Sequence, residues 1–115
     1  MATVTGERLK GKVAIVTGGG SGFGRATSQR FLSEGCKVIV GDLNEDTAKE
    51  TISKASSSSE NGVAVKFDVT SQEGWSRAVK EALDRFGRLD IVVNNAGWSY
   101  NNKVNMMIQV VTIED

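Results

Sequence analysis

The sequence has no histidine and a single cysteine, Cys36, among its 115 residues. One cysteine cannot form an internal disulfide, which is typical of proteins from a reducing compartment. Cys36 could instead be a nucleophile, but the chain has no histidine to activate it. Because it lies at the entry to an apolar segment, a small packed core residue is the favoured interpretation.

The chain also has no net charge, since 14 basic and 14 acidic residues balance. This balance favours neither a nucleic acid nor an anionic membrane, so a small molecule or a protein is the expected partner. Residues 1–12 contain no apolar signal-peptide core, and no apolar run approaches the roughly 20 residues that span a bilayer. We therefore expect a soluble, cytoplasmic protein.

Four short apolar runs are expected to form strands. They are rich in β-branched residues and do not alternate with polar ones, which is typical of strands covered on both faces. The runs are Val13–Val16, Val38–Val40, Val63–Val65 and Ile91–Val93. Between them the sequence predicts helices over Gly22–Gly35, Asn44–Ala55 and Thr70–Phe86, and residues 56–62 favour a solvated loop over a regulated linker.

The third expected helix has the clearest signals. Thr70 and Glu73 have the spacing of a capping box, with the Thr70 hydroxyl accepting from the Glu73 amide. An apolar stripe at helical spacing follows. Its members are Trp75, Ala78, Val79, Ala82, Leu83 and Phe86. Gly87 is expected to end the helix.

Strands that alternate with helices pair in parallel through right-handed connections. The predicted fold class is therefore α/β, a Rossmann-like doubly wound parallel sheet, incomplete, with four strands in the order 3-2-1-4. Ligands of such sheets bind outside the carboxyl ends of the strands, at the switch point between strands 1 and 4. The residues that follow each strand are therefore the candidates for a binding site.

The first strand is followed by a glycine-rich turn, Thr17–Arg25, with the spacing G-x-x-x-G-x-G. Close approach of main chain to a pyrophosphate requires residues without a Cβ, and a helix N-terminus offers free amides and a positive dipole. Gly18, Gly22 and Gly24 would serve the turn, the close approach and the helix–sheet contact. Turns without ligands use the same residues, but the position between a buried strand and a helix favours a phosphate-binding role.

Asp42 ends the second strand, about 20 positions beyond the glycine turn, where the adenosine ribose of a dinucleotide should lie. Its carboxylate can accept from both ribose hydroxyls and would repel the 2′-phosphate of NADP. No Arg or Lys follows it closely and Ser21 brings no positive charge, so NAD is predicted in preference to NADP. The alternative role for Asp42 is a helix N-cap.

Two further segments follow strands. Asp68 could accept from the exocyclic amine of adenine, with Val69 packing on the ring, or it could cap the next helix; position alone leaves both roles open. Asn94–Gly97 combines two amides with two small residues, which lets main chain approach a ligand. A simple turn is the alternative, and the location across the switch point disfavours it.

Together these segments resemble the short-chain dehydrogenase/reductase family, from about Leu9 to Gly97. The matching motifs are Thr17-Gly18-x-x-x-Gly22-x-Gly24, Asp42, Asp68-Val69 and Asn94-Asn95-Ala96-Gly97. The resemblance implies an NAD-dependent oxidoreductase of alcohols or ketones. It further implies pyrophosphate contacts at Ser21 and Phe23, adenosine ribose at Asp42, adenine at Asp68 and Val69, and the nicotinamide-side ribose at Asn95, Ala96 and Gly97. Thr17 and Asn94 would connect the ends of strands 1 and 4.

Family members are longer and take a catalytic Ser and a Tyr-x-x-x-Lys pair from their second half. The resemblance therefore implies an N-terminal fragment, with residues 1–97 as the NAD-binding half-domain and residues 98–115 as an atypical tail. Tyr100 and Lys103 are three positions apart rather than four, so no catalytic residue is assigned, and no metal site either. Residues 104–115 indicate a frayed strand or an altered end.

In a complete fold, strand 4 would pair with a fifth parallel strand. We therefore expect it to be an exposed edge here, with marginal stability, self-association, weak NAD binding and no activity of the chain alone. A non-catalytic nucleotide-binding or interaction module is the alternative function. A methyltransferase with a related sheet is disfavoured by the longer glycine turn together with Asn94–Gly97.

Overall fold

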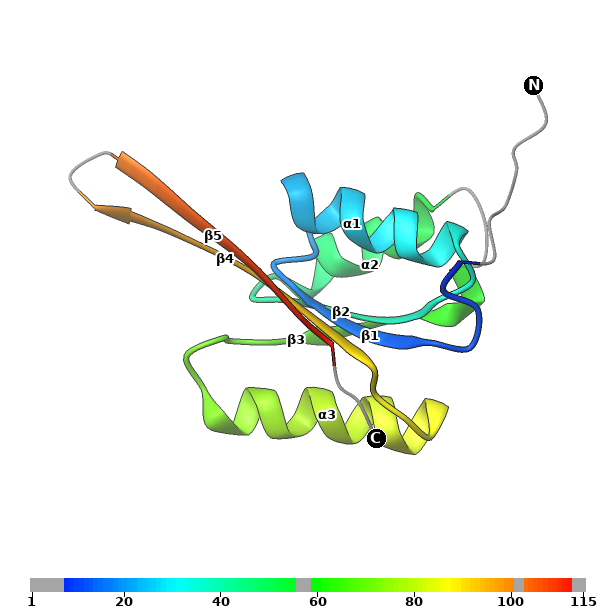
Figure 1. Cartoon of the computed structure of the whole chain (residues 1–115). Helices are drawn as coiled ribbons and strands as arrows, with labels where there is room; N and C mark the ends of the chain where they lie inside the picture. Colours follow the sequence, from blue (N-terminus) through cyan, green and yellow to red (C-terminus); the bar gives the residue numbers. More distant parts are fainter. Residues whose placement is uncertain (1–7, 56–58, 101–102, 113–115) are drawn as a thin grey trace, which may run out of the picture.

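The computed structural model describes residues 8–55, 59–100 and 103–112. These residues form a sheet with helices on both faces (Figure 1). In chain order the elements are β1 (Val13–Thr17), α1 (Gly22–Ser33), β2 (Lys37–Asp42), α2 (Glu45–Ser53), the short 3-10 helix η1 (Ser59–Asn61), β3 (Gly62–Lys66), α3 (Gln72–Phe86), β4 (Ile91–Tyr100) and β5 (Lys103–Thr112). The strand order is β3-β2-β1-β4-β5. Figure 1 shows α1 and α2 on one face of the sheet and α3 on the other. The predicted order 3-2-1-4 is confirmed.

β1 lies at the centre of the parallel part of this sheet. It pairs with β2 from Val13 opposite Lys37 to Thr17 opposite Gly41, and with β4 from Ala14 opposite Ile91 to Val16 opposite Val93. β2 pairs in parallel with β3 in turn. Because these four strands run in one direction, the carboxyl ends of β1, β2 and β3 lie at one edge of the sheet, and β4 continues past that edge to Tyr100.

Successive residues of β1 point to opposite faces and separate two cores. Val13 and Ile15 belong to the core under α3, with Phe67, Ala78 and Ala82 among its buried members. Ala14 and Val16 belong to the core under α1 and α2, which also contains Leu32, Cys36 and Ala48. Both faces are covered, so the unalternated apolar runs are the expected pattern.

Cys36 is fully buried in the core under α1 and α2. Burial raises the pKa of its thiol to about 12, so the nucleophilic thiolate is not populated near neutral pH. The interpretation as a packed core residue is confirmed.

The start of α3 differs from the predicted capping box. The Thr70 hydroxyl donates to Asp68 Oδ1 at 2.7 Å, while the Ser71 hydroxyl caps the helix by accepting from the Gly74 amide at 3.1 Å. The box at Thr70 is therefore wrong, because the neighbouring carboxylate binds that hydroxyl. The predicted end is confirmed, since Gly87 follows the helix with φ 78°.

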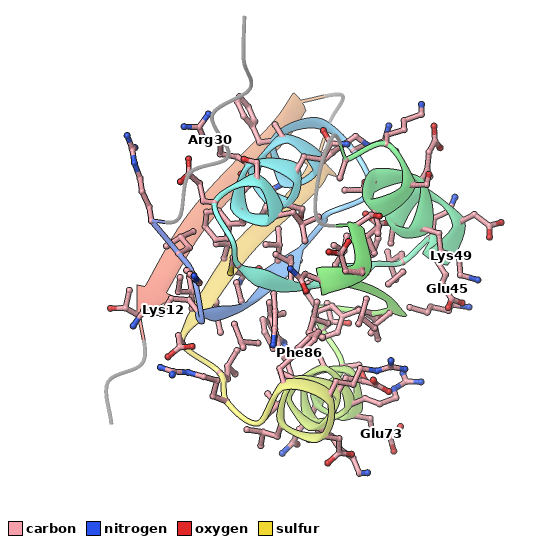
Figure 2. All side chains as sticks on the ribbon, turned by 90° about the vertical axis from the view of Figure 1, so that its right-hand side faces the viewer. Lys12, Arg30, Glu45, Lys49, Glu73 and Phe86 are labelled. Carbon is pink, nitrogen blue, oxygen red and sulfur yellow. The ribbon has the colours of Figure 1, made fainter. Side chains whose placement is uncertain are left out.

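The stripe on α3 is confirmed with one exception. Ala78 and Ala82 are buried, and Trp75, Val79 and Phe86 pack at the edge of the same core. Figure 2 shows Phe86 on the side of α3 that faces the sheet and Glu73 on the outer side. Leu83 keeps 49% of its surface exposed, although its spacing placed it in the stripe.

β4 and β5 form an antiparallel pair, from Ile91 opposite Thr112 to Tyr100 opposite Lys103. The expectation that β4 is an exposed edge is wrong, because the β-branched residues after Lys103 provide it with a neighbour and antiparallel strands need only a short connection. Residues 94–97 also lie inside β4, not in a turn after it. Figure 1 shows the pair extending beyond the parallel strands.

The serine run and the Tyr100–Lys103 connection lie partly outside the described residues, at 56–58 and 101–102. Within the part of the chain that the structure describes, none of the helices combines the length and the apolar character needed to cross a membrane.

Candidate functional site

The candidate site lies at the edge where β1 and β2 end and where the middle of β4, at Asn94 and Asn95, passes beside them. β1 leads into the glycine turn before α1, β2 ends at Asp42, and β4 brings Asn94 and Asn95 beside the turn. The topology therefore brings together three of the predicted segments.

The glycine turn crosses itself at Gly18 and Gly24. A Cβ on Gly24 would overlap the carbonyl oxygen of Gly18, and a Cβ on Gly18 would overlap the carbonyl oxygen of Asn95. Gly18 also has φ 65° and Gly22 has φ 54°, a region that favours glycine. Around Gly22 a Cβ would meet open space. The glycines at 18 and 24 are therefore required by the fold, whereas Gly22 borders free volume.

The turn is also bonded to β2. The Gly19 amide donates to the Gly41 carbonyl oxygen at 3.0 Å, and the Gly20 amide donates to Asp42 Oδ2 at 2.9 Å. The Asp42 carboxylate thus faces the turn.

Asp42 is half-buried at the rim of the site. Its second oxygen, Oδ1, accepts from the Asn44 amide at 3.0 Å. The cap of α2 is Asn44, whose side chain accepts from the amides of Asp46 and Thr47. The alternative of Asp42 as the N-cap is therefore wrong. Since each carboxylate oxygen can accept more than one hydrogen bond, Asp42 retains capacity for a ligand.

The N-terminus of α1 opens toward solvent at this edge. Ser21 precedes the helix and its side chain caps no amide of α1, and the first turn contains no acidic residue. Phe23, in that turn, is 62% exposed. Free amides and the positive end of the helix dipole favour an anion here.

Thr17 joins the end of β1 to the middle of β4. Its hydroxyl donates to Asn94 Oδ1 at 2.9 Å and accepts from the Asn95 amide at 3.0 Å. The connection expected between Thr17 and Asn94 is therefore present. The Asn95 side chain lies against Gly18 and Gly24, and its buried Oδ1 has no hydrogen-bond partner. A buried acceptor without a protein partner is unusual, and it leaves a hydrogen-bonding position that a water molecule or a ligand can occupy.

Asp68 and Val69 follow β3 at the same edge. Asp68 is exposed and accepts from the amide and hydroxyl of Thr70, and these bonds lower the pKa of its carboxyl. The capping role left open for Asp68 is wrong, because Ser71 is the cap. Val69 is half-buried, and its carbonyl accepts from Trp75 Nε1 at 2.9 Å.

For Ala96 and Gly97 the structure describes the backbone only, opposite Met107 and Met106 in β5. Among residues 8–55, 59–100 and 103–112, no three His, Cys, Asp or Glu side chains are placed to hold a metal ion.

The sequence reasoning missed Thr51. Its side chain is fully buried and its hydroxyl donates to the Gly19 carbonyl at 2.7 Å. It lies one position before Ile52 on the inner face of α2, and nothing in its spacing distinguishes it from an ordinary helical threonine.

A dinucleotide fits these residues. The crossing glycines leave main chain bare beside the α1 N-terminus, Gly22 borders open space, and a carboxylate lies at the rim. Pyrophosphate chemistry requires the first two features and a ribose diol matches the third.

The short chain dehydrogenase family model matches residues 12–114. The 2,5-dichloro-2,5-cyclohexadiene-1,4-diol dehydrogenase LinX of Sphingobium indicum is 42% identical over 91 residues, which are 79% of this chain and 36% of that protein. The hydroxysteroid dehydrogenase from Escherichia coli superposes with a TM-score of 0.72 at 35% identity, over 79% of this chain and 39% of that one.

The 3-ketoacyl-(acyl-carrier-protein) reductase from Brucella melitensis, solved in complex with NADH, superposes with a TM-score of 0.71 at 39% identity. The superposition covers 77% of this chain and 35% of the reductase. The chain thus spans somewhat more than a third of the length of the relatives it matches.

Proposed function

The chain belongs to the short-chain dehydrogenase family, and from that premise we propose that its glycine turn and Asp42 bind NAD in preference to NADP. The observation that carries the proposal is the crossing of Gly18 and Gly24 at the N-terminus of α1, with the Asp42 carboxylate bonded to the Gly20 amide. This arrangement supports the proposal, because bare main chain at a helix N-terminus can accept an anion and the neighbouring carboxylate can accept hydrogen bonds from a diol.

The preference for NAD rests on charge. The 2′-phosphate of NADP would lie beside Asp42, and one like-charge pair at about 4 Å costs about 4 kcal/mol at an effective dielectric of about 20. Arg25 is the cation of the turn, but its guanidinium donates to Thr51 Oγ1 and the Thr47 carbonyl and pairs with Glu50 at 3.6 Å. All of these contacts are with α2, and none of them is with Asp42.

The other predicted contacts are part of the same proposal. Ser21 and Phe23 offer their amides to the pyrophosphate, and Asp68 and Val69 receive the adenine. Asn95, Ala96 and Gly97 border the nicotinamide-side ribose. The open first turn of α1 and the unpartnered Asn95 Oδ1 support the first and last of these assignments.

The reaction proposed for the whole protein is oxidation of an alcohol or reduction of a ketone. When bound, the nicotinamide would accept or supply the hydride. We assign residues 1–97 to holding and orienting that cofactor, and no catalytic residue to this chain, because the sequence contains no Tyr-x-x-x-Lys pair. The 115-residue chain alone should give no turnover in a hydride-transfer assay.

Isothermal titration with NAD and with NADP tests the cofactor assignment. We expect NAD to bind more tightly, and Asp42→Asn to weaken NAD binding about tenfold or more, because hydrogen bonds to a charged group contribute about 1.5–3 kcal/mol. Asp84→Asn, which changes the same charge on the outer face of α3, is the matched control. Equal or tighter binding of NADP by the unmodified chain would refute the assignment.

A further inference from the structure

Thr51 connects three elements through its buried hydroxyl. Oγ1 lies 2.7 Å from the Gly19 carbonyl oxygen and 3.1 Å from the Thr47 carbonyl oxygen, and it accepts from Arg25 Nε at 3.0 Å. A hydroxyl has one hydrogen to donate. Because the Gly19 carbonyl is nearer, it receives the hydroxyl hydrogen. Two consecutive hydrogen bonds therefore connect Arg25 on α1, Thr51 on α2 and the glycine turn.

Gly19 and Gly20 share one peptide group, and both of its polar atoms are bonded. The carbonyl of Gly19 accepts from Thr51, and the amide of Gly20 donates to Asp42 Oδ2. In a trans peptide these two atoms point in opposite directions. Thr51 and Asp42 therefore hold the same peptide plane from opposite sides.

Gly19 is closely packed at its α-carbon, and this packing does not fix the tilt of the Gly19–Gly20 peptide. A Cβ on Gly19 would meet Val40 Cγ1 at 2.5 Å and Ser28 Oγ at 3.3 Å, so the α-carbon already lies close to β2 and α1. Glycine itself restricts rotation of the plane very little. The Gly19 amide is held by the Gly41 carbonyl, so the two hydrogen bonds of the next peptide are the polar contacts that fix its orientation.

Arg25 determines which way the Thr51 hydroxyl donates. Its Nε–H occupies one acceptor site of Oγ1, which leaves the hydroxyl hydrogen to the carbonyl side, and bonds in such a chain polarise one another. Gln29 supports the same residue, because its Nε2 donates to the Thr51 carbonyl at 3.1 Å. Two residues of α1 thus orient one threonine of α2.

We propose that Thr51 is a positioning residue for the cofactor site: it orients the Gly19–Gly20 peptide and, through that peptide, the Asp42 carboxylate. That NAD is the ligand rests on the proposed function. The coupling between Thr51 and Asp42 exists in the ligand-free protein and does not depend on it. Loss of the hydroxyl frees the peptide to rotate, which removes the Gly20 donor from Asp42.

Amide exchange in the ligand-free chain, followed by NMR, tests the coupling directly. Thr51→Val should speed exchange of the Gly20 amide about tenfold, as expected for the loss of one net hydrogen bond. Thr51→Ser keeps the hydroxyl and should restore slow exchange. Ile52→Val, which trims the neighbouring residue of the same helix, is the control and should leave Gly20 unchanged.

A double-mutant cycle on NAD affinity gives the second readout. If each of Thr51→Val and Asp42→Asn weakens NAD about tenfold, the double variant should lose far less than the product, because both act through one peptide. Ile52→Val combined with Asp42→Asn should be additive. Arg25→Met, which removes the donor to Oγ1, should reproduce a smaller part of the exchange effect and serves if Thr51→Val does not fold.

Unchanged Gly20 exchange in Thr51→Val or Arg25→Met, additive losses in the cycle, or a serine variant as impaired as the valine variant would overturn the inference. Absence of NAD binding by the unmodified chain would instead refute the proposed function, and the exchange experiment would still decide the role of Thr51.

Discussion

β1 pairs with Ile91–Val93 of β4, and the two ends of this paired segment are built differently. At the carboxyl end of the paired segment, the Thr17 hydroxyl bonds Asn94 and Asn95, bare glycines cross, and the Asn95 Oδ1 atom has no partner. At the amino ends, the Asp90 carboxylate accepts from the Val13 amide at 2.9 Å and from two nitrogens of Arg88 at 2.8 and 2.6 Å.

The difference separates stability from binding. The Asp90 end satisfies a nearly buried charge with three hydrogen bonds, so removing it should cost folding free energy. The glycine end leaves an acceptor unpartnered and main chain uncovered, which lowers stability unless a ligand supplies the missing contacts. Substitutions at the two ends should therefore affect different measurements.

The largest effect is expected at the glycine crossing. In Gly24→Ala the new methyl group would overlap the Gly18 carbonyl, so the turn must open. Overpacking of this kind costs about 1–3 kcal/mol, and at the upper end NAD affinity would fall about 100-fold. Calorimetric titration with NAD measures the loss.

Gly87→Ala is the control, because it is the same substitution outside the site: Gly87 has φ 78°, and a Cβ there meets no atom within 4 Å. It should reduce the free energy of unfolding by about 1 kcal/mol without changing NAD affinity. Equal NAD affinities of the two variants would show that the crossing is not part of the binding site.

The second effect is expected at the opposite end. Asp90→Ala leaves the Val13 amide without its acceptor and Arg88 without its carboxylate, so the free energy of unfolding should fall by about 2 kcal/mol. Urea denaturation measures it. Asp84→Ala, which breaks an exposed pair with Lys80, should change it by less than about 1 kcal/mol. If an Asp90 variant kept its stability but lost NAD binding, the assignment of this end of the strands to stability would be refuted.

The pH dependence gives a second check on Asp90. The hydrogen bond from Arg88 lowers the pKa of Asp90 in the folded chain. A lowered folded-state pKa means that the stabilisation is fully present above the unfolded-state value of about 3.9 and is lost as pH falls through the folded-state value. Asp90→Ala should remove this part of the acid-induced loss of stability.

Much of the parallel sheet could be predicted because its signals are local and redundant. Unalternated β-branched runs mark β1 to β4, and alternation with helices indicates a parallel, doubly wound sheet, for which the order 3-2-1-4 is a common one. The glycine turn is also readable, since Gly18 and Gly24 stand where no side chain fits. Such features can be recognised from residue types and their spacing along the chain.

What could not be predicted depends on competition between partners. Thr70 has the spacing of a cap, but Asp68 binds its hydroxyl and Ser71 becomes the cap. Thr51 has no distinguishing spacing, and its role arises only when α2 packs beside the turn. The pairing of β4 with β5 likewise depends on the chain reversing after Tyr100, which the run of residues 104–111 does not show.

The smallest effect on stability is expected at Asp68. Its carboxylate is exposed to solvent, whereas that of Asp90 is nearly buried. The Thr70 hydroxyl is the main cause of the lowered pKa of Asp68, so Thr70→Val should raise that pKa while the Thr70 amide bond remains. Because the folded-state pKa is lowered, the small stabilisation exists above about pH 3.9 and is lost on acidification.

NMR titration of the Asp68 carboxyl measures the rise, and the urea midpoint at neutral pH should hardly move. Ser71→Ala is the matched control: it removes the cap of α3 at a cost of about 1 kcal/mol and should leave the Asp68 pKa unchanged. If Thr70→Val destabilised the chain as much as Ser71→Ala, Thr70 rather than Ser71 would be the effective cap. The residues after β3 would then contribute to stability as the Asp90 end does.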